Sequence, residues 1–264
     1  MKKWSIALAC TAGLLIQGTP SAQAASDITP SYEVKFNVDV DAFQNQTALI
    51  NAFDATHDED VNVYYFDTPD QQFKKKGYIH RLRVYASDKK TNITYKKVFP
   101  GVPVEDAIAE ADTKGFTNDM SNYKFENDRK DGVDSFSISR KETFKKNKHL
   151  TFDGIDVDYA IQLFKDEAPK KVRGWDDETW YQNTLTHTIP YGPAQANTYV
   201  GEYKGVEADL EIWTYKGETI AEISTKVDQK QLADDIEQSW HQGLTDADWL
   251  SEEQISKTSF VMDR

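Results

Sequence analysis

The stretch of residues 63–83, VYYFDTPDQQFKKKGYIHRLR, contains the pattern that decides the fold. Two runs rich in aromatic and β-branched residues flank the turn signal DTPD at 67–70, and this order predicts two strands joined by a short connection. Alternate residues of a strand face the same side of a sheet. Arg81 and Arg83 are therefore expected to share one face of the second strand, and Leu82 to lie on the other.

Runs of the same kind recur along the chain. The predicted strands lie near 31–40, 61–67, 78–86, 92–99, 134–143, 156–164, 205–214 and 218–226. Apolar residues at helical spacing predict helices within 41–54 and 228–242, packed on a sheet. Strands that outnumber helices, with several apparent hairpins, indicate an α+β fold with an antiparallel sheet large enough to curl. We predict an eight-stranded antiparallel β tunnel or barrel with helices packed outside, because about eight strands suffice for closure.

The chain contains no long repeat, low-complexity tract or Pro/Gly/Ser linker that would divide it. A single domain over 25–264 is therefore expected. Residues 100–132 are charged and poorly patterned, and residues 165–200 contain several aromatic residues without a clear period. Both segments are interpreted as excursions from the main body.

The first residues predict export. Two lysines precede a mostly apolar run that ends in Ala22-Gln23-Ala24, the small-x-small pattern that signal peptidases cut. Residues 1–24 are therefore expected to be a signal peptide, cleaved near Ala24 to give a periplasmic or secreted protein. Stable membrane insertion is not expected, since no later segment approaches about twenty apolar residues. Cleavage removes Cys10, the single cysteine, and leaves neither a disulfide nor a thiol nucleophile.

The charge and the absent motifs exclude several classes of function. A formal net charge of −13 argues against binding to nucleic acid or to anionic lipid, so a polyanion would need a concentrated local group of cations. The five histidines show no metal-ligand spacing. No phosphate loop, dinucleotide fingerprint, Gly-x-Ser-x-Gly or His-Glu-x-x-His motif is present.

Charged side chains also alternate along other predicted strands. Same-face sets are Ser31, Glu33 and Lys35 in the first strand, Thr94 and Lys96 in the fourth, and Glu211, Glu222 and Ser224 in the last two. If these faces point into one barrel, its interior holds several cations beside two or three carboxylates. Ammonium and guanidinium groups can surround phosphate oxygens, while carboxylates hold a divalent metal against them. Alternation of this kind is also typical of the solvated face of an ordinary sheet.

The tyrosine, Asp-Thr-Pro and Arg-x-Arg run within 63–83 resembles that of the CYTH superfamily, the triphosphate tunnel metalloenzymes. Taken loosely, the resemblance covers residues 31–99, 134–164 and 205–260. It implies eight antiparallel strands that form a tunnel, with helices outside. It also implies activity on triphosphate-containing substrates with Mg²⁺ or Mn²⁺ as the cofactor.

The resemblance further implies roles for individual residues. Phosphate contacts are implied for Lys35, Arg81, Arg83, Lys96 and one of Arg140 or Lys141, and metal contacts for Glu33, Glu211 and Glu222, with Glu33 and Glu222 as the catalytic pair. Two positions depart from the family pattern, because Ser31 and Ser224 stand where glutamates are expected. A hydroxyl can hydrogen-bond a metal-bound water but supplies no negative charge. The site is therefore short of two carboxylates.

Three functional hypotheses follow. The leading one is an exported protein that binds a triphosphate-containing small molecule or polyphosphate and hydrolyses it with a divalent metal. The alternative is a noncatalytic polyphosphate- or anion-binding protein on the same barrel, with the cations retained and too few carboxylates for a working metal. A third is a barrel that binds an apolar or sugar ligand through the aromatic residues of 165–200, which would be favoured if Arg81 and Arg83 lay on the outer surface.

Overall fold

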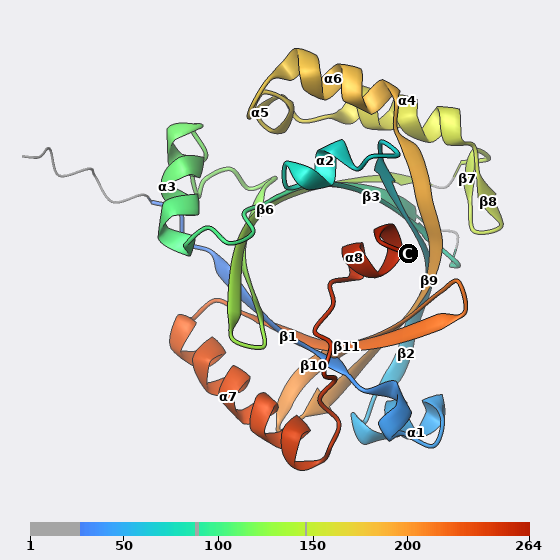
Figure 1. The fold of residues 1–264 in the computed structure, drawn as a ribbon, viewed down its shortest axis with the longest axis vertical. Helices are drawn as coiled ribbons and strands as arrows, with labels where there is room; N and C mark the ends of the chain where they lie inside the picture. The colour runs from blue at the N-terminus through green and yellow to red at the C-terminus, as the bar shows by residue number, and fades with distance from the viewer. Residues whose placement is uncertain (1–26, 88–89, 146) are drawn as a thin grey trace, which may run out of the picture.

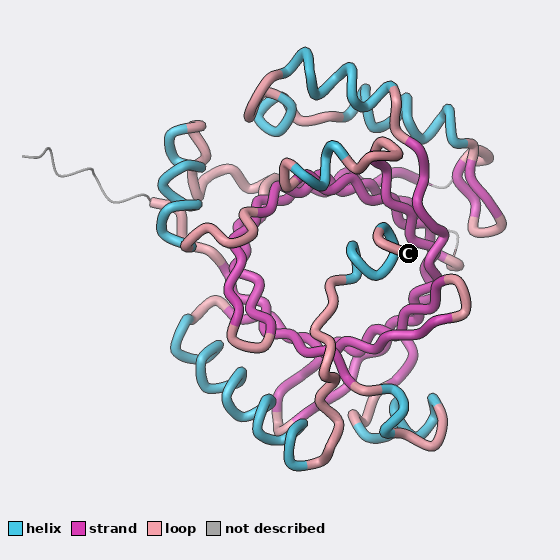
Figure 2. The backbone as a smooth tube through the Cα atoms, viewed as in Figure 1, coloured by secondary structure: helices cyan, strands magenta, loops and turns pink. Residues whose placement is uncertain are grey.

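The computed structural model describes residues 27–87, 90–145 and 147–264, so the predicted signal peptide lies outside the described residues. Within this part, nine strands form one closed barrel (Figures 1 and 2). Around the barrel the strands follow the order β1, β11, β10, β9, β2, β3, β4, β6, β5. Their bounds are β1 Ser31–Val38, β2 Thr56–Asp67, β3 Tyr78–Tyr85, β4 Lys90–Val98, β5 Lys124–Lys130, β6 Val133–Lys145, β9 Ile189–Tyr203, β10 Val206–Tyr215 and β11 Glu218–Val227.

This barrel confirms the predicted α+β tunnel fold and differs from the expectation in two details. The described residues supply nine barrel strands instead of eight. In addition, β1 closes the ring by pairing with β5 in parallel, with Ser31 opposite Glu126 and Lys35 opposite Lys130, whereas its pairing with β11 is antiparallel. The parallel closure places β5 in the tunnel wall.

The segments interpreted as excursions each contribute a barrel strand. Strand β5 lies within 100–132 and pairs with β6 as well as β1. Strand β9 begins within 165–200 and pairs with β2 and β10. The predicted strand over 156–164 is wrong, because this segment is helix α4 (Val157–Glu167). The Asp156 side chain caps its first turn, and the buried Ala160 and Phe164, four residues apart, lie on one helical face.

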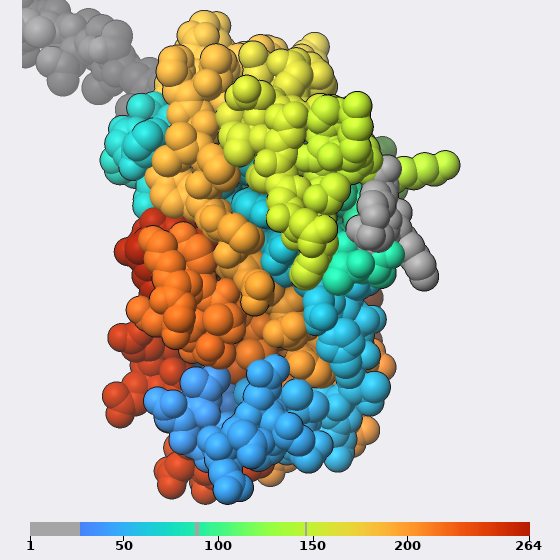
Figure 3. Space-filling model, turned by 90° about the vertical axis from the view of Figure 1, so that its right-hand side faces the viewer, coloured from blue at the N-terminus to red at the C-terminus, as the bar shows by residue number. Residues whose placement is uncertain are grey.

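Helices cover the outside of the barrel in two groups (Figure 1). Helices α2 (Gln72–Lys75), α3 (Val104–Thr113), α4, α5 (Lys170–Arg173) and α6 (Glu178–Thr186) lie over the β2–β3–β4–β6 side, near the short hairpin of β7 (Leu150–Thr151) and β8 (Gly154–Ile155). The 3₁₀ turn η1 (Val40–Ala42), α1 (Gln46–Ala52) and α7 (Lys230–Asp246) cover the β1–β11–β10 side. Figure 3 shows β9 running between the yellow-green α4 region and the blue α1 region. The predicted helices within 41–54 and 228–242 correspond to α1 and α7.

The last helix, α8 (Lys257–Met262), lies inside the barrel (Figures 1 and 2). Its Phe260 and Val261 are fully buried in a cluster with Val63, Tyr65 and other inward-facing residues of the wall. The sequence predicted helices only on the outside, so this internal helix is a correction. A short amphipathic segment can bury its apolar side chains in a tunnel as well as against a sheet.

The chain reaches α8 through one end of the barrel. Leu250 forms a bridge with Val38 at the end of β1, and the backbone amide of Ser251 donates to the carbonyl oxygen of Asn37 at 3.0 Å. The C-terminal segment therefore closes this end. Among the described helices, none combines the length and apolar character required to cross a membrane.

Candidate functional site

The tunnel wall brings most of the sequence-predicted site residues onto one inner surface. On β3 and β4, Arg81 is the register partner of Thr94, and Thr94 is that of Lys141 on β6. Register pairs share a face, so these side chains share the inner side with Lys96, two residues along β4. Arg140 lies on the opposite, outer side of β6, where it pairs with Glu142 and packs over the Tyr123 ring. Of the two alternatives, Lys141 is therefore the residue on the tunnel face.

A first charge network joins β1, β4 and β5. The Nζ atom of Lys35 lies 2.8 Å from Glu33 and 2.5 Å from Asp128, and Lys96 lies 2.8 Å from the other oxygen of Asp128. Burial opposes ionisation of Glu33, but the charges of Lys35, Lys226 and Lys96, with a hydrogen bond to Asp128, together outweigh it and hold the pKa of this carboxyl well below its usual value. Lys226 closes the network at the tunnel end by contacting Glu33 at 3.4 Å. The predicted phosphate ligands Lys35 and Lys96 are thus neutralised by carboxylates of the chain itself.

A second network joins the two remaining predicted metal ligands. Glu211 on β10 and Glu222 on β11 are direct register partners. The Nζ atom of Lys257, the first residue of α8, lies 2.8 Å from an oxygen of each carboxylate. Lys130 contacts the other oxygen of Glu222 at 2.7 Å. Burial would raise the pKa of Glu211, but Lys257 and Arg83 lower it to about 2.

Further cations on the inner face without an ion-pair partner among the described residues include Arg81, Arg83, Lys90, Lys124 and Lys141. The Nε atom of Arg81 is buried without a hydrogen bond. Burial lowers the pKa of Lys141, and repulsion from Lys124, Arg83 and Lys90 adds to this effect. Like charges gathered without counter-ions favour the binding of an anion.

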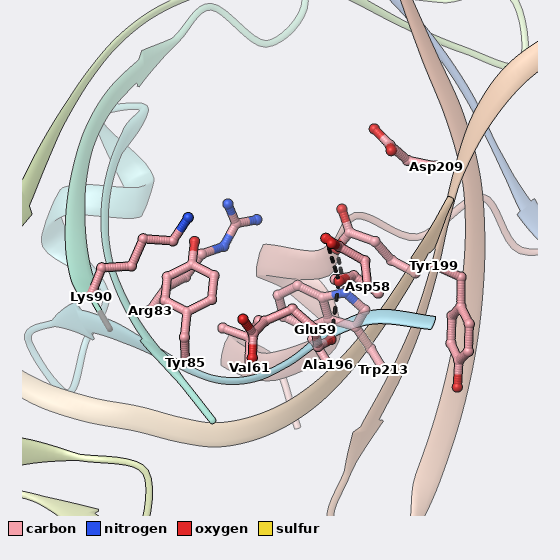
Figure 4. Close-up of a pocket in the computed structure, with 12 residues that line it drawn as sticks. Asp58, Glu59, Val61, Arg83, Tyr85, Lys90, Ala196, Tyr199, Asp209 and Trp213 are labelled. Atoms are coloured by element: carbon pink, nitrogen blue, oxygen red, sulfur yellow. Dashed lines mark hydrogen bonds between the residues drawn. The ribbon is translucent and has the colours of Figure 1, made fainter. Parts of the chain in front are cut away.

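A cavity of about 230 Å³ lies beside this cation cluster, at the end of the tunnel away from Val38 and Leu250. Arg83 and Lys90 extend toward its open space from one wall, with Tyr85 between them (Figure 4). Asp209 faces them from another wall (Figure 4). The tunnel is therefore closed by the C-terminal segment at one end and has a cavity at the other, whose charged lining comprises Arg83, Lys90 and the carboxylates Asp58, Glu59, Asp209 and Glu211.

Several residues of this surface were missed by the sequence analysis. Asp128, Glu126 and Lys130 lie on β5, a strand whose run KFENDRK has no apolar alternation. Lys226 is the last residue of the predicted final strand, and Lys257 lies within the 205–260 segment that resembles the family but outside the motifs that carry the resemblance. Ser31 and Ser224 both belong to the inner-face sets, since Ser31 pairs with Glu126 and Ser224 with Asp209.

Acid is expected to destabilise the protein through Glu211. Its pKa is about 2 in the folded state and about 4.3 in an unfolded chain, so its stabilising contribution is complete above pH 4.3 and is lost as the pH falls toward 2. In urea unfolding between pH 5 and pH 2.5, the free energy of unfolding should fall with decreasing pH more steeply for the parent than for Glu211→Gln. The two slopes should differ by up to about 1.4 kcal/mol per pH unit. Glu207→Gln, an exposed change on the same strand, should keep the parent slope. Equal slopes for parent and Glu211→Gln would contradict the depressed pKa.

Comparison with known proteins gives a family and a set of similar folds. The model of the CYTH domain matches residues 29–164. No curated protein is similar enough to count as a match. An adenylyl cyclase candidate from Hippeastrum with a dominant triphosphatase activity is 14% identical, with a TM-score of 0.49, over 86% of this chain and 92% of that chain. An adenylate cyclase candidate from Bacillus halodurans is 14% identical, with a TM-score of 0.49, over 88% and 97%. A protein from Pyrococcus horikoshii is 14% identical, with a TM-score of 0.46, over 87% and 97%.

Proposed function

The chain belongs to the CYTH domain family, and from this premise we propose that its tunnel binds the phosphate chain of a triphosphate-containing small molecule or of polyphosphate. The resemblance inferred from the Asp-Thr-Pro and Arg-x-Arg run is confirmed at the level of the family over residues 29–164. The proposed binding site is the cavity end of the tunnel, with Arg83 and Lys90 as its first contacts.

The observation that carries this proposal is the group of inner-face cations without ion-pair partners. Arg81 and Arg83 lie on β3 and Lys141 lies on β6, and β4 is hydrogen-bonded to both strands, so the backbone positions of these residues relative to one another are fixed. A linear phosphate chain carries several negative charges along a short length, and guanidinium groups bind phosphate oxygens through paired hydrogen bonds. Such a ligand would pair directly with these cations, in competition with the carboxylates Asp58, Glu59, Asp209 and Glu211 that line the same cavity.

The expected Mg²⁺ or Mn²⁺ does not fit the carboxylates as the structure arranges them. Glu211 and Glu222 are bridged by Lys257, and Glu33 is paired with Lys35 and Lys226. The two serines in place of glutamates add no charge. Over the described residues, no group of three or more His, Cys, Asp or Glu side chains is arranged to hold a metal ion. We therefore favour binding of a phosphate chain over metal-dependent hydrolysis.

The hypothesis of an apolar or sugar ligand and the prediction of export stand differently. A ligand site for an apolar molecule or sugar would be favoured by an outward position of Arg81 and Arg83, whereas both lie on the tunnel side of β3. The aromatic residues Trp175 and Tyr181 of the 165–200 segment are buried in the core under the outer helices. Export to the periplasm or the medium is proposed from residues 1–24 alone.

Calorimetric titration with tripolyphosphate in the presence of a chelator tests the proposal. Arg83→Ala should weaken binding by roughly 10- to 100-fold, the value of a charge-assisted hydrogen bond at a partly buried site. Arg140→Ala is the matched control, because it removes an arginine from the outer side of the barrel. A second titration with adenosine triphosphate distinguishes a nucleotide ligand from an inorganic one.

Two outcomes would contradict the proposed function. One is a parent protein that binds neither tripolyphosphate nor adenosine triphosphate. The other is equal affinity for the parent, Arg83→Ala and Arg140→Ala, because binding would then not involve the tunnel cations.

A further inference from the structure

Glu211 and Glu222 form an electrostatically unfavourable pair that the fold places face to face. They are direct partners across β10 and β11, with side chains only 17% and 5% exposed. Like charges directly opposite on neighbouring strands repel each other, and burial strengthens the repulsion. A cation between them is therefore required for both to remain ionised.

Lys257 supplies this cation. Its Nζ atom lies 2.8 Å from Oε1 of Glu211 and 2.8 Å from Oε1 of Glu222. The other two carboxylate oxygens are also bonded, because Trp213 Nε1 donates to Oε2 of Glu211 at 2.8 Å and Lys130 lies 2.7 Å from Oε2 of Glu222. All four oxygens of the pair therefore have a donor from the chain.

The position of Lys257 is fixed by the helix that it begins. Ser256 caps α8 by accepting from the amide of Ser259 at 3.0 Å. Farther along, Phe260 and Val261 are fully buried against the barrel wall. A lysine held by such packing loses little further freedom when it bridges two carboxylates. The packing of α8 thus holds the ammonium group of Lys257 at a fixed position in the tunnel.

The charges of this cluster balance. Glu211 and Glu222 contribute two negative charges, and Lys257 and Lys130 contribute two positive charges, which is the charge that one divalent cation would bring. We infer that Lys257 is a tethered cation in the position where these carboxylates would otherwise hold a divalent metal, and that phosphate binding in this chain is therefore independent of metal.

Lys257 acts on the phosphate site through Glu211. Glu211 lines the cavity into which Arg83 points. Without a counter-ion, this carboxylate would repel a phosphate chain in the cavity and compete with it for Arg83. Lys257 is therefore a positioning residue for the anion site. This second half of the inference rests on the proposed phosphate-binding function, whereas the displacement of metal by Lys257 does not.

Titration with Mn²⁺ alone tests the first half. The parent should show no saturable binding of Mn²⁺ at Glu211 and Glu222. Lys257→Met leaves the two carboxylates without their bridge, so its affinity for Mn²⁺ should exceed that of the parent by about tenfold or more. The matched control is Lys230→Met, which removes a 65% exposed lysine and should behave like the parent. Adding Glu222→Gln to Lys257→Met should abolish the gain.

Three results would overturn the metal half of the inference: saturable Mn²⁺ binding by the parent that Glu222→Gln removes, a folded Lys257→Met protein without increased affinity, or a gain that survives Glu222→Gln. If Lys257→Met does not fold, Lys257→Arg and the parent still test whether a cation at this position excludes Mn²⁺. Both keep a cation at this position and should leave Mn²⁺ unbound, and binding that Glu222→Gln removes would contradict the inference.

Titration with tripolyphosphate tests the second half. Parent affinity should be the same with a chelator and with Mn²⁺, whereas Lys257→Met should bind more weakly with the chelator and recover when Mn²⁺ is added. Lys257→Arg should retain parent affinity in both conditions. A parent that requires Mn²⁺ would overturn this half. A parent that binds no phosphate under either condition would refute the proposed function and leave the Mn²⁺ titration to decide the role of Lys257.

Discussion

Replacing Asp128 with alanine is expected to lower the free energy of unfolding by about 3 to 5 kcal/mol, because it leaves two lysines in the tunnel without their shared counter-ion. Asp128 accepts from Lys35 at 2.5 Å through one oxygen and from Lys96 at 2.8 Å through the other. Its side chain is 11% exposed, so water cannot fully replace the lost carboxylate. Denaturation in urea, with parent and variant compared at neutral pH, measures the loss.

The control for this prediction lies on the neighbouring strand. Asp134 contacts Arg129, which also binds Asp234 and Glu237, and its side chain is 40% exposed. Asp134→Ala should therefore cost less than about 1 kcal/mol. Adding Lys96→Met to Asp128→Ala should recover part of the loss, since one unpaired cation is removed. Equal losses for Asp128→Ala and Asp134→Ala would show that the tunnel network does not stabilise the fold as described.

The inner faces of β1, β3, β10 and β11 could be predicted because each of these strands carries charged side chains at alternate positions, with apolar residues between them. In β3 the buried and partly exposed residues alternate along the whole strand. Arg81 and Arg83 were therefore assigned to one face from the sequence alone. The period of a strand is a local property, so the sequence suffices to show it.

Strand β5 could not be predicted because its environment removes the signal. Its inner side faces the charged tunnel and carries Glu126, Asp128 and Lys130, while Asn127 and Arg129 stand on the other side. A strand with polar side chains on both faces has no hydrophobic period. Its place in the barrel depends on hydrogen bonds to β6, the next strand in the chain, and to β1, which is distant in sequence. Asp128, the residue that joins Lys35 to Lys96, was missed for this reason.

Lys257 was missed for a different reason. Glu211 and Glu222 were identified as metal ligands because they matched a family pattern, and that pattern implies a divalent metal as their cation instead of a lysine of the chain. The cation here comes from a six-residue helix that returns into the barrel after α7. Such a helix is too short for its period to be recognised. Its position follows only from the three-dimensional path of the chain.

Replacing Phe260 with alanine is expected to destabilise the protein by about 3 to 5 kcal/mol. Phe260 is 0% exposed and belongs to the cluster that α8 forms with the inner wall. The strands of a closed barrel cannot collapse readily into the space left by the missing phenyl group. The free-energy cost of this cavity should therefore add to that of the lost burial of apolar surface. The loss is measured by urea denaturation.

Leu232→Ala provides the comparison, because Leu232 lies on α7 and is 44% exposed. Its loss should be below about 1 kcal/mol, as for surface substitutions that create no cavity. A Phe260→Ala loss as small as that of Leu232→Ala would mean that α8 does not pack inside the barrel. Because α8 carries Lys257 to Glu211 and Glu222, Phe260→Ala should also loosen that bridge. The variant should therefore bind Mn²⁺ more tightly than the parent, whereas Leu232→Ala should not.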